Sequence, residues 1–308
     1  MRAIGVDIGG TKIALGAVDA EGNVVLRASL PTEAGLGFPH AVDRVCRAID
    51  GILEQAGWGA GELAGIGIGC AGPVDPRLGL INNPYTLSGW DRCDIVTPLR
   101  ERFSVPVHLE NDADAALVGE CWIGAGRGCD PVVMLTFGTG VGGAAMIGGR
   151  ILRGANGEHP EMGHVAVKAD GPECYCGIRG CLESLASGSA IAAAGIEGGY
   201  RDIAAVFSAA EKGELRAKRI SGRALDAAAT AAWTLFHSFL PQRLILGGGL
   251  MERLQGPFAA AMNRRLQPAT QFSHSSFAIV PAALGNDAGI VGAARICHRP
   301  SHSTKTQS

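Results

Sequence analysis

The stretch VDIGGTK, residues 6–12, places an apolar strand, an aspartate and a glycine turn in immediate succession. The two glycines, Gly9 and Gly10, let backbone N–H groups approach an anion without an intervening side chain, and Thr11 adds a hydroxyl donor. The carboxylate of Asp7 would lie beside that anion and could hold Mg²⁺ directly or through water. The same residues also suit an ordinary β-hairpin turn with a surface aspartate.

A second glycine loop of the same character occupies residues 137–143, FGTGVGG. It matches the dinucleotide pattern G-x-G-x-x-G, but that pattern must open a helix. Here the following residues indicate a hairpin with its turn at Gly148-Gly149, and no acidic residue follows about 20 positions later at a strand end. The P-loop sequence G-x-x-x-x-G-K-[ST] is absent as well. Two glycine–threonine hairpin loops therefore predict a nucleotide held between two lobes.

Strands and helices alternate along the rest of the chain, which implies an α/β fold whose sheet has parallel members. The segment strand–glycine turn–strand at 2–18 recurs at 131–147, a weak hint of an internal repeat. Strands are predicted at 2–8, 12–18, 24–29, 64–69, 105–109, 131–136, 144–147, 243–246 and 277–280. Helices are predicted at about 39–56, at 113–122, within 186–240, from about 257, and at 287–297.

Composition excludes several classes of protein. A chain of 308 residues can bury a sizeable core, as two domains or as one divided α/β unit. A net charge of -2 without a basic run argues against a nucleic-acid partner. Neither a signal-peptide pattern nor about 18 consecutive apolar residues occurs, so we expect no membrane association and a cytoplasmic location.

The nine cysteines are unevenly distributed. Six are scattered and fit small buried apolar residues of a reducing compartment. The other three form Cys-x-Cys-x₄-Cys between glycines. Together with a nearby histidine they supply four N/S ligands, which suit a structural Zn²⁺ ion without an open coordination position. The alternative is three incidental thiols beside a histidine. The predicted ligands are His164, Cys174, Cys176 and Cys181.

Seven motifs in order give the chain a resemblance to the ROK family (repressors, open reading frames, kinases). They are VDIGGTK at 6–12, GCAGPVD at 69–75, ENDADAA at 110–116, TFGTGVGG at 136–143, EMGH at 161–164, CYCGIRGCLE at 174–183 and LGNDAGIVGAA at 284–294. The resemblance spans roughly residues 2–297. It implies a two-lobed actin-like ATPase (ribonuclease H-like) fold with a structural zinc motif.

This resemblance implies that both glycine loops hold ATP phosphates and that the glycines at 247–249 border the adenosine. The residues it assigns to the nucleotide and its Mg²⁺ are Asp7, Gly9, Gly10, Thr11, Lys12, Gly138, Thr139, Gly140, Gly142 and Gly248. It also supports the zinc ligands. For the lobes we expect 1–112 plus 288–298 in a small lobe, 113–287 with the zinc motif in a large lobe, and a disordered tail at 299–308.

Taken alone, Asn111 and Asp112 could be only residues that cap a helix. The resemblance implies instead that Asp112 is the general base that accepts the sugar hydroxyl proton, a role that phosphoryl transfer requires. Asp114 should point elsewhere. The family match places the remaining sugar-contacting residues at Gly72, Asn83, Asn111, Glu161, His164 and Glu183. His164 would contact the sugar with one ring nitrogen and zinc with the other.

The predicted activity is transfer of the ATP γ-phosphate to a sugar 6-hydroxyl, with glucose as the expected substrate. His159-Pro160 before Glu161 is similar to fructokinase-like members, whereas Asn83-Pro84 and Leu87-Ser88-Gly89-Trp90 look closer to the glucokinase pattern. Fructose, mannose or an N-acetylhexosamine (GlcNAc or ManNAc) stays open. A sugar-responsive regulator is the alternative of another class, but Asp7 lies too near the start for a preceding DNA-binding domain. Relatives are often dimers, so we expect a homodimer.

Overall fold

The computed structural model describes residues 2–270 and 276–297 and divides into two compact units. The first unit contains the chain up to Ile123 and from Asp287 onward, and the second is Gly124–Asn286. This division differs from the predicted boundary after Asp112, because the helix that begins there packs within the first unit. The predicted tail at 299–308 lies outside the described residues.

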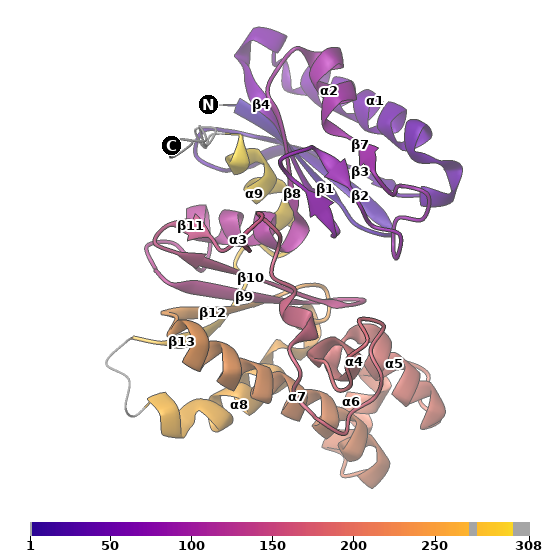
Figure 1. Cartoon of the computed structure of the whole chain (residues 1–308), viewed down its shortest axis with the longest axis vertical. Coiled ribbons are helices and arrows are strands. Elements are labelled where there is room, and N and C mark those ends of the chain that lie inside the picture. The colour runs from indigo at the N-terminus through magenta and orange to yellow at the C-terminus, as the bar shows by residue number, and fades with distance from the viewer. Residues whose placement is uncertain (1, 271–275, 298–308) are drawn as a thin grey trace. The chain divides into compact units, whose positions relative to one another are not determined.

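The sheet of the first unit has the order β3-β2-β1-β4-β8 (Figure 1). Three strands form an antiparallel meander, and the other two continue the sheet in parallel with β1. Every predicted strand of this unit is therefore present. The strands are β1 (Arg2–Ile8), β2 (Lys12–Val18), β3 (Val24–Pro31), β4 (Leu63–Cys70) and β8 (Val107–Asn111).

The sheet of the second unit repeats that arrangement in the order β11-β10-β9-β12-β13. Again three strands form an antiparallel meander, and two more continue it in parallel. The repeat suggested by two strand–turn–strand segments is thus a repeat of a whole sheet. The strands are β9 (Val132–Phe137), β10 (Val141–Ile147), β11 (Arg150–Ile151), β12 (Arg243–Gly247) and β13 (Ala278–Pro281).

Helices cover both faces of the first sheet (Figure 1). α1 (Phe38–Ala56) and α2 (Val96–Phe103) lie on one face, and α9 (Ala288–Ile296) lies on the other with α3 (Asp112–Ile123) packed against it. A Cβ atom on Gly292 of α9 would lie 1.6 Å from the carbonyl oxygen of Ala115 in α3. The two backbones touch, which explains why α3 belongs to the first unit.

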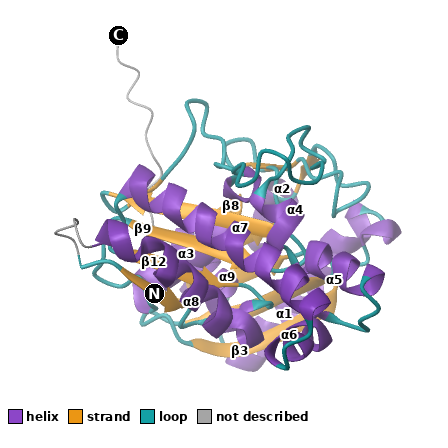
Figure 2. Ribbon diagram, turned by 90° about the horizontal axis from the view of Figure 1, so that it is seen from below, coloured by secondary structure: helices purple, strands orange, loops and turns teal. Residues whose placement is uncertain are grey.

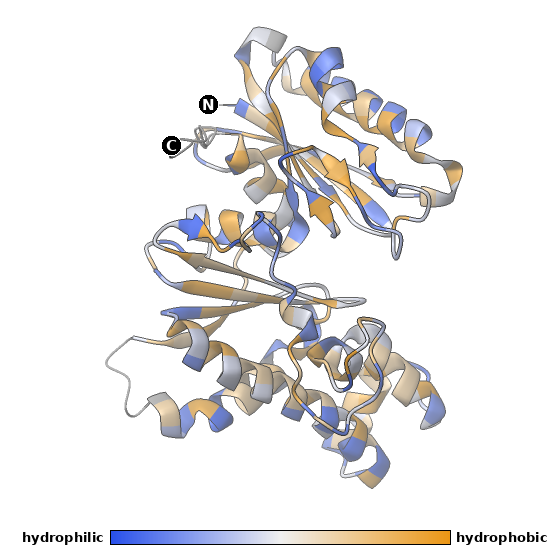
Figure 3. Ribbon diagram, viewed as in Figure 1, coloured by the Kyte–Doolittle hydropathy of each residue, from blue (hydrophilic) through white to orange (hydrophobic). Residues whose placement is uncertain are grey.

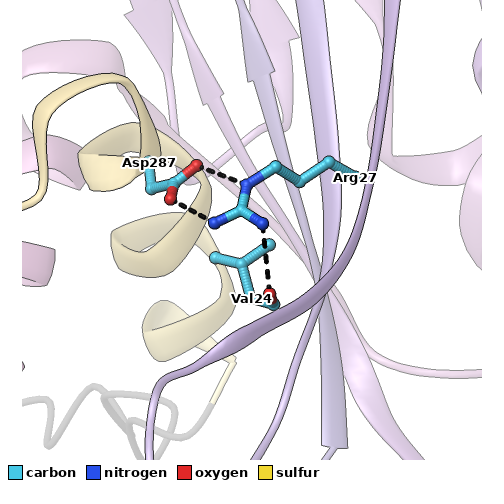
Figure 4. Close-up of polar contacts among 3 residues, drawn as sticks. All are labelled: Val24, Arg27 and Asp287. Carbon is cyan, nitrogen blue, oxygen red and sulfur yellow. Dashed lines mark hydrogen bonds and ion pairs between the residues drawn. The ribbon is translucent and has the colours of Figure 1, made fainter.

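An ion pair fixes the start of α9 to β3 (Figure 4). The guanidinium group of Arg27 donates to Asp287 through Nε at 2.9 Å and Nη2 at 2.5 Å, and through Nη1 to the Val24 carbonyl at 3.3 Å. Paired donors of this kind orient a carboxylate as well as attract it. Asp287 belongs to the LGNDAGIVGAA motif, so this part of the motif serves the fold.

The second unit is covered by five helices within its described residues. The two longest lie side by side, α7 along α8, in Figures 1 and 2. α8 begins at Met251, six residues before the predicted start, because Pro257 lies inside the helix and does not open it. They are α4 (Leu182–Ala186), α5 (Gly188–Glu197), α6 (Ile203–Glu211), α7 (Leu215–Phe239) and α8 (Met251–Thr270).

Apolar residues concentrate in the strands and on the inner sides of the helices (Figure 3). They form a large core in each unit, and in the first unit a smaller cluster also lies between the sheet and α9. Smaller elements complete the described chain: the antiparallel sheet β5-β6-β7 (Val74–Asp75, Leu80–Ile81, Cys93–Asp94) and the 3₁₀ helices η1 (Ala34–Leu36), η2 (Ala60–Glu62), η3 (Met162–His164) and η4 (Gly285–Asp287). Among the described residues, no helix has the length and apolar character needed to span a bilayer.

Candidate active site and metal centre

The first glycine turn connects β1 to β2, and Thr32 holds it through two hydrogen bonds. The N–H of Gly9 donates to the Lys12 carbonyl at 2.9 Å. The fully buried Thr32 donates its hydroxyl to the Gly9 carbonyl at 2.6 Å and its N–H to the Thr11 carbonyl at 3.0 Å. Thr11 and Lys12 are exposed. The turn is therefore a fixed hairpin that presents its hydroxyl and ammonium groups to solvent. No motif pointed to Thr32.

Two carboxylates of the first unit lie near each other. Asp7 is close to the end of β1, and Asp112 begins α3 directly after β8. Burial, followed by the negative charge of Asp112, raises the pKa of Asp7 to about 7, while the Lys12 charge opposes this shift. Two like charges in partly buried positions favour a proton or a cation between them. In the sheet Asp7 pairs with Gly69, where a Cβ atom would lie 3.7 Å from the Asp112 Cα atom, so the predicted Mg²⁺ residue and the predicted base are neighbours.

Asp112 differs in burial from the polar residues around it. Asn111 is buried, and its Oδ1 accepts from the N–H groups of Ala113 at 2.9 Å and Asp114 at 3.3 Å, which caps α3. Asp114 is fully buried, whereas Asp112 is only half-buried. The amide nitrogen of Asn111 faces Gly72, where a Cβ atom would lie 2.8 Å from it. The structure brings Gly72 and Asn111 together.

Asn83 has a different role from the predicted sugar contact. Its Nδ2 donates to the Ala71 carbonyl at 3.1 Å and to the Thr86 hydroxyl at 2.7 Å. Its Oδ1 accepts from the N–H groups of Tyr85 and Thr86 at 3.0 and 2.9 Å. An amide side chain has two donors and two acceptor positions, so the loop uses all four. Asn83 is 1% exposed and organises its own loop.

The second glycine loop connects β9 to β10 and lies against the start of α5. The N–H groups of Gly188 and Ser189 donate to the carbonyls of Gly138 at 2.8 Å and Thr139 at 3.3 Å. β10 follows the loop with Gly142 in its second position, so a strand and not a helix comes next. The rejection of the dinucleotide pattern is confirmed.

Gly248 follows β12 and lies against the same loop. It has a positive φ of 86°, and a Cβ atom there would lie 2.4 Å from the Phe137 carbonyl oxygen. Only glycine fits this approach. A cavity of 330 Å³ opens beside it, lined among others by Gly248, Glu252, Pro281 and Asn286. The Asn286 amide donates to the Glu252 carboxylate at 3.2 Å. Mixed apolar and polar lining of this kind suits a flat heteroaromatic group.

The Glu183 side chain reaches back to the glycine loop. Its Oε2 accepts from the Val141 N–H at 2.8 Å. A Cβ atom on Gly140 would lie 2.4 Å from that oxygen, and one on Gly163 would lie 1.9 Å from the Val141 carbonyl oxygen. Both glycines therefore allow segments of the EMGH and CYCGIRGCLE motifs to touch the start of β10.

Glu161, His164 and Glu183 share one neighbour, Tyr175. Glu161 is exposed and precedes η3, in which His164 lies. The Nε2 atom of His164 lies 3.1 Å from the Tyr175 hydroxyl. Partial burial, then the charge of Glu183 and a hydrogen bond to it, with a smaller effect of Glu161, raise the pKa of Tyr175 well above its usual range. The hydroxyl is therefore protonated and donates to Glu183. In the motif Cys-x-Cys, Tyr175 occupies only the variable position between two cysteines.

The four predicted zinc ligands form one cluster, and their ligand atoms all lie within 4.8 Å of one another. The Cys174 sulfur is 3.5 Å from His164 Nδ1, and the Cys176 sulfur is 3.5 Å from that of Cys181. Two ligands of one tetrahedral zinc ion stand about 3.5–3.8 Å apart, given bond lengths of about 2.0–2.3 Å. The donor set fits the ion, and so do these two distances of 3.5 Å.

The pKa values of the three thiols are shifted by burial, by hydrogen bonds and by one another. Burial and the neighbouring sulfur atoms raise the pKa of Cys181 to about 12, and burial raises that of Cys174. A backbone hydrogen bond from Ile178 lowers the pKa of Cys176. Three thiolates this close repel one another, and a bound divalent cation removes that cost.

The duplicated sheet and its paired glycine turns define an α/β protein of the actin-like ATPase fold. A family model described as the ROK family matches residues 3–300, and the chain belongs to that family. The glucokinase of Thermotoga maritima is 34% identical over 316 residues, which cover 96% of this chain and 97% of that protein.

Two solved structures share the fold over nearly their whole length. The ROK hexokinase from Thermus thermophilus has a TM-score of 0.83 at 33% identity, over 96% of this chain and 97% of that one. A ROK family glucokinase from Streptomyces griseus, in complex with glucose and AMPPNP, has a TM-score of 0.79 at 32% identity, over 96% and 99%. Both relatives thus match this chain over nearly its whole length.

Proposed function

We propose that the protein is an ATP-dependent glucose kinase that phosphorylates the sugar 6-hydroxyl. The observation that carries this proposal is the neighbouring pair Asp7 and Asp112 in the first unit. One carboxylate is suited to a cation and the other to a proton, which are the two needs of phosphoryl transfer. The glucokinase from Thermotoga maritima and the glucose complex of the Streptomyces griseus enzyme support glucose as the acceptor.

Each site residue has one role in this reaction. Asp112 accepts the proton of the sugar 6-hydroxyl as its oxygen forms a bond to the γ-phosphorus and the bond to the ADP oxygen breaks. Glu161, His164 and Glu183 bind other sugar hydroxyls. The carboxylates accept from hydroxyl groups, and the ring Nε2–H of His164 donates. Gly72 and Asn111 border the sugar, and Asn83 fixes the loop beside Gly72.

The two glycine loops bind the nucleotide. The turn at Gly9, Gly10, Thr11 and Lys12 and the loop at Gly138, Thr139, Gly140 and Gly142 offer N–H, hydroxyl and ammonium groups to phosphates. The cavity beside Gly248 takes the adenine of this nucleotide. The AMPPNP bound in the Streptomyces griseus structure supports an adenine nucleotide as the phosphate donor.

Two metal ions complete the proposal. Asp7 would hold Mg²⁺, which when bound neutralises charge on the phosphates. The cluster of His164, Cys174, Cys176 and Cys181 would hold a structural Zn²⁺. With Nδ1 on the metal, the His164 ring is fixed and its Nε2–H faces away from the sulfur atoms.

A coupled ADP-release assay tests the proposal, with glucose, fructose, mannose, GlcNAc and ManNAc as acceptors at equal concentration. We expect the highest kcat/KM with glucose. A higher value for another sugar would mean that the protein is a kinase of that sugar and not of glucose. No ADP release with any of the five sugars would contradict the proposed kinase activity. Sedimentation of the purified protein measures the expected homodimer.

A further inference from the structure

Tyr175 is placed where a substrate hydroxyl is needed. It lies between Cys174 and Cys176, and its hydroxyl is 3.1 Å from His164 Nε2. The same hydroxyl is hydrogen-bonded to the Glu183 carboxylate. His164 and Glu183 are two of the three residues of the second unit that we assign to the sugar. A side chain of the protein thus joins two groups that the substrate should join.

The hydrogen bonds have the polarity of a bound sugar hydroxyl. With Nδ1 of His164, which lies 3.5 Å from the Cys174 sulfur, on the proposed zinc ion, Nε2 would carry the ring proton and donate to the Tyr175 oxygen. The Tyr175 hydroxyl then donates to Glu183. A phenol and a sugar hydroxyl each offer one donor and acceptor lone pairs. Tyr175 can therefore take the place of a sugar hydroxyl without leaving His164 or Glu183 unsatisfied.

The side chain also has room to leave. Tyr175 is 67% exposed although its hydroxyl is engaged. Its ring meets that of His164 edge-on, with centroids 5.0 Å apart. The backbone on both sides forms a tight turn, in which the N–H of Cys174 donates to the Ile178 carbonyl and that of Gly177 to the Cys174 carbonyl, both at 2.9 Å. Rotation about the side-chain bonds would move the hydroxyl away while the turn stays in place.

We propose that Tyr175 is an internal competitor of the sugar: its hydroxyl occupies one sugar-hydroxyl position between His164 and Glu183 in the sugar-free protein and swings out when glucose binds. The proposal rests on the proposed sugar-binding role of these two residues. It makes Tyr175 a residue that sets affinity and selectivity. Only a sugar with a hydroxyl that both accepts from His164 and donates to Glu183 restores the bonds lost when Tyr175 leaves.

This mechanism has a direct consequence for affinity. A site that is open in only a fraction of the molecules binds its ligand more weakly by that fraction. The Tyr175→Phe substitution keeps the ring and removes the hydroxyl, so the closed form loses the hydrogen bonds that favour it. The dissociation constant for glucose should therefore fall by about 2- to 10-fold.

Calorimetric titration of the full-length zinc-loaded protein with glucose, without nucleotide, tests the proposal. Tyr200→Phe is the matched control, because Tyr200 is a tyrosine of the same unit whose hydroxyl donates to Glu214 outside the site. Tyr175→Phe should bind glucose more tightly than wild type, and Tyr200→Phe should bind it equally. A purely supporting hydroxyl would give the opposite sign, since its loss weakens binding.

An unchanged or higher dissociation constant in Tyr175→Phe, at unaltered zinc content, would overturn the proposal. Its failure is distinguishable from that of the kinase function. Wild-type protein that phosphorylates glucose while the variant shows no gain in affinity contradicts only the role of Tyr175. Wild-type protein that neither binds nor phosphorylates glucose contradicts the proposed function itself.

Discussion

The carboxylate of Glu183 accepts a hydrogen bond from the backbone N–H of Val141 at 2.8 Å. Glu183 is a proposed sugar ligand, and Val141 belongs to the glycine loop proposed to bind phosphates. A single hydrogen bond thus fixes the position of a sugar-binding carboxylate relative to the loop. Gly140 makes the contact possible, because any Cβ there would lie 2.4 Å from the carboxylate oxygen.

The Gly140→Ala substitution should therefore weaken glucose binding. The added methyl group displaces the Glu183 carboxylate and breaks its bond to Val141. A hydrogen bond to a charged group is worth about 1.5–3 kcal/mol, so we expect the dissociation constant for glucose to rise about 10-fold or more. Calorimetry without nucleotide measures it. Gly138→Ala is the matched control, since a Cβ atom there meets nothing within 4 Å. Equal glucose affinities of the two variants would contradict this relationship.

Loss of the metal should lower stability and sugar affinity together. Cys176 is the exposed ligand of the cluster, so Cys176→Ser removes a thiolate with little change in packing. A metal-free cluster leaves the turn at 174–178 and the His164 ring without their anchor. Each kcal/mol lost from the free energy of unfolding should lower the melting temperature by about 2–4 °C.

Metal analysis, thermal unfolding and glucose titration of the same samples provide the measurements for this variant. Cys129→Ser, which changes a half-buried cysteine outside the cluster, serves as the control and should keep all three values. Wild-type protein purified without stoichiometric zinc would contradict the proposed structural ion. Cys176→Ser with normal zinc content would contradict its binding by this cluster.

The sequence predicted most strands and long helices of this fold because their periodicity and glycine turns are local properties. It did not predict the short sheet β5-β6-β7 or α2, whose runs of two to eight residues carry too little pattern. The start of α8 was also misplaced, because a proline in a sequence more often opens a helix than lies inside it. The unit boundary depends on the contact of Gly292 with Ala115, residues far apart in the chain.

The candidate site shows the same limit. The cluster of His164 with the three cysteines was predictable, since the three cysteines lie within eight residues and the chemistry of this donor set is specific. The use of all four hydrogen-bonding positions of Asn83 was not, because it depends on the path of its own loop. Thr32 and Tyr175 act through single contacts with distant residues, and no sequence pattern announces such contacts.

Asp112→Asn should abolish turnover and leave sugar binding largely intact. The amide keeps the shape of the side chain but cannot accept the hydroxyl proton, so kcat should fall by about 100- to 10,000-fold. Steady-state ADP release and calorimetric glucose titration, run on the same preparation, separate the two effects. Activity near that of wild type would eliminate Asp112 as the base, and a parallel loss of glucose binding would indicate a structural role.

Asp7→Asn should make the protein more stable at neutral pH and less active. The folded-state pKa of Asp7, about 7, lies above the ordinary value of 3.8. Between these two pH values the folded state binds more protons than the unfolded state, so the free energy of unfolding falls as pH rises. At about 1.4 kcal/mol per pKa unit the loss amounts to at most about 4 kcal/mol by pH 8. Because asparagine does not ionise, the Asp7→Asn variant does not lose this free energy of unfolding.

The difference between wild type and Asp7→Asn should therefore be small near pH 4 and grow to its full value above pH 7. Urea unfolding across this range, without added Mg²⁺ and without a chelator that would strip zinc, measures it. The exposed Asp170→Asn variant is the control and should follow wild type at every pH. Kinase activity of Asp7→Asn should fall at every pH, because the proposed Mg²⁺ ligand is gone. Stability curves of wild type and Asp7→Asn that run parallel would mean that Asp7 titrates normally. Neither burial nor the charge of Asp112 would then raise its pKa.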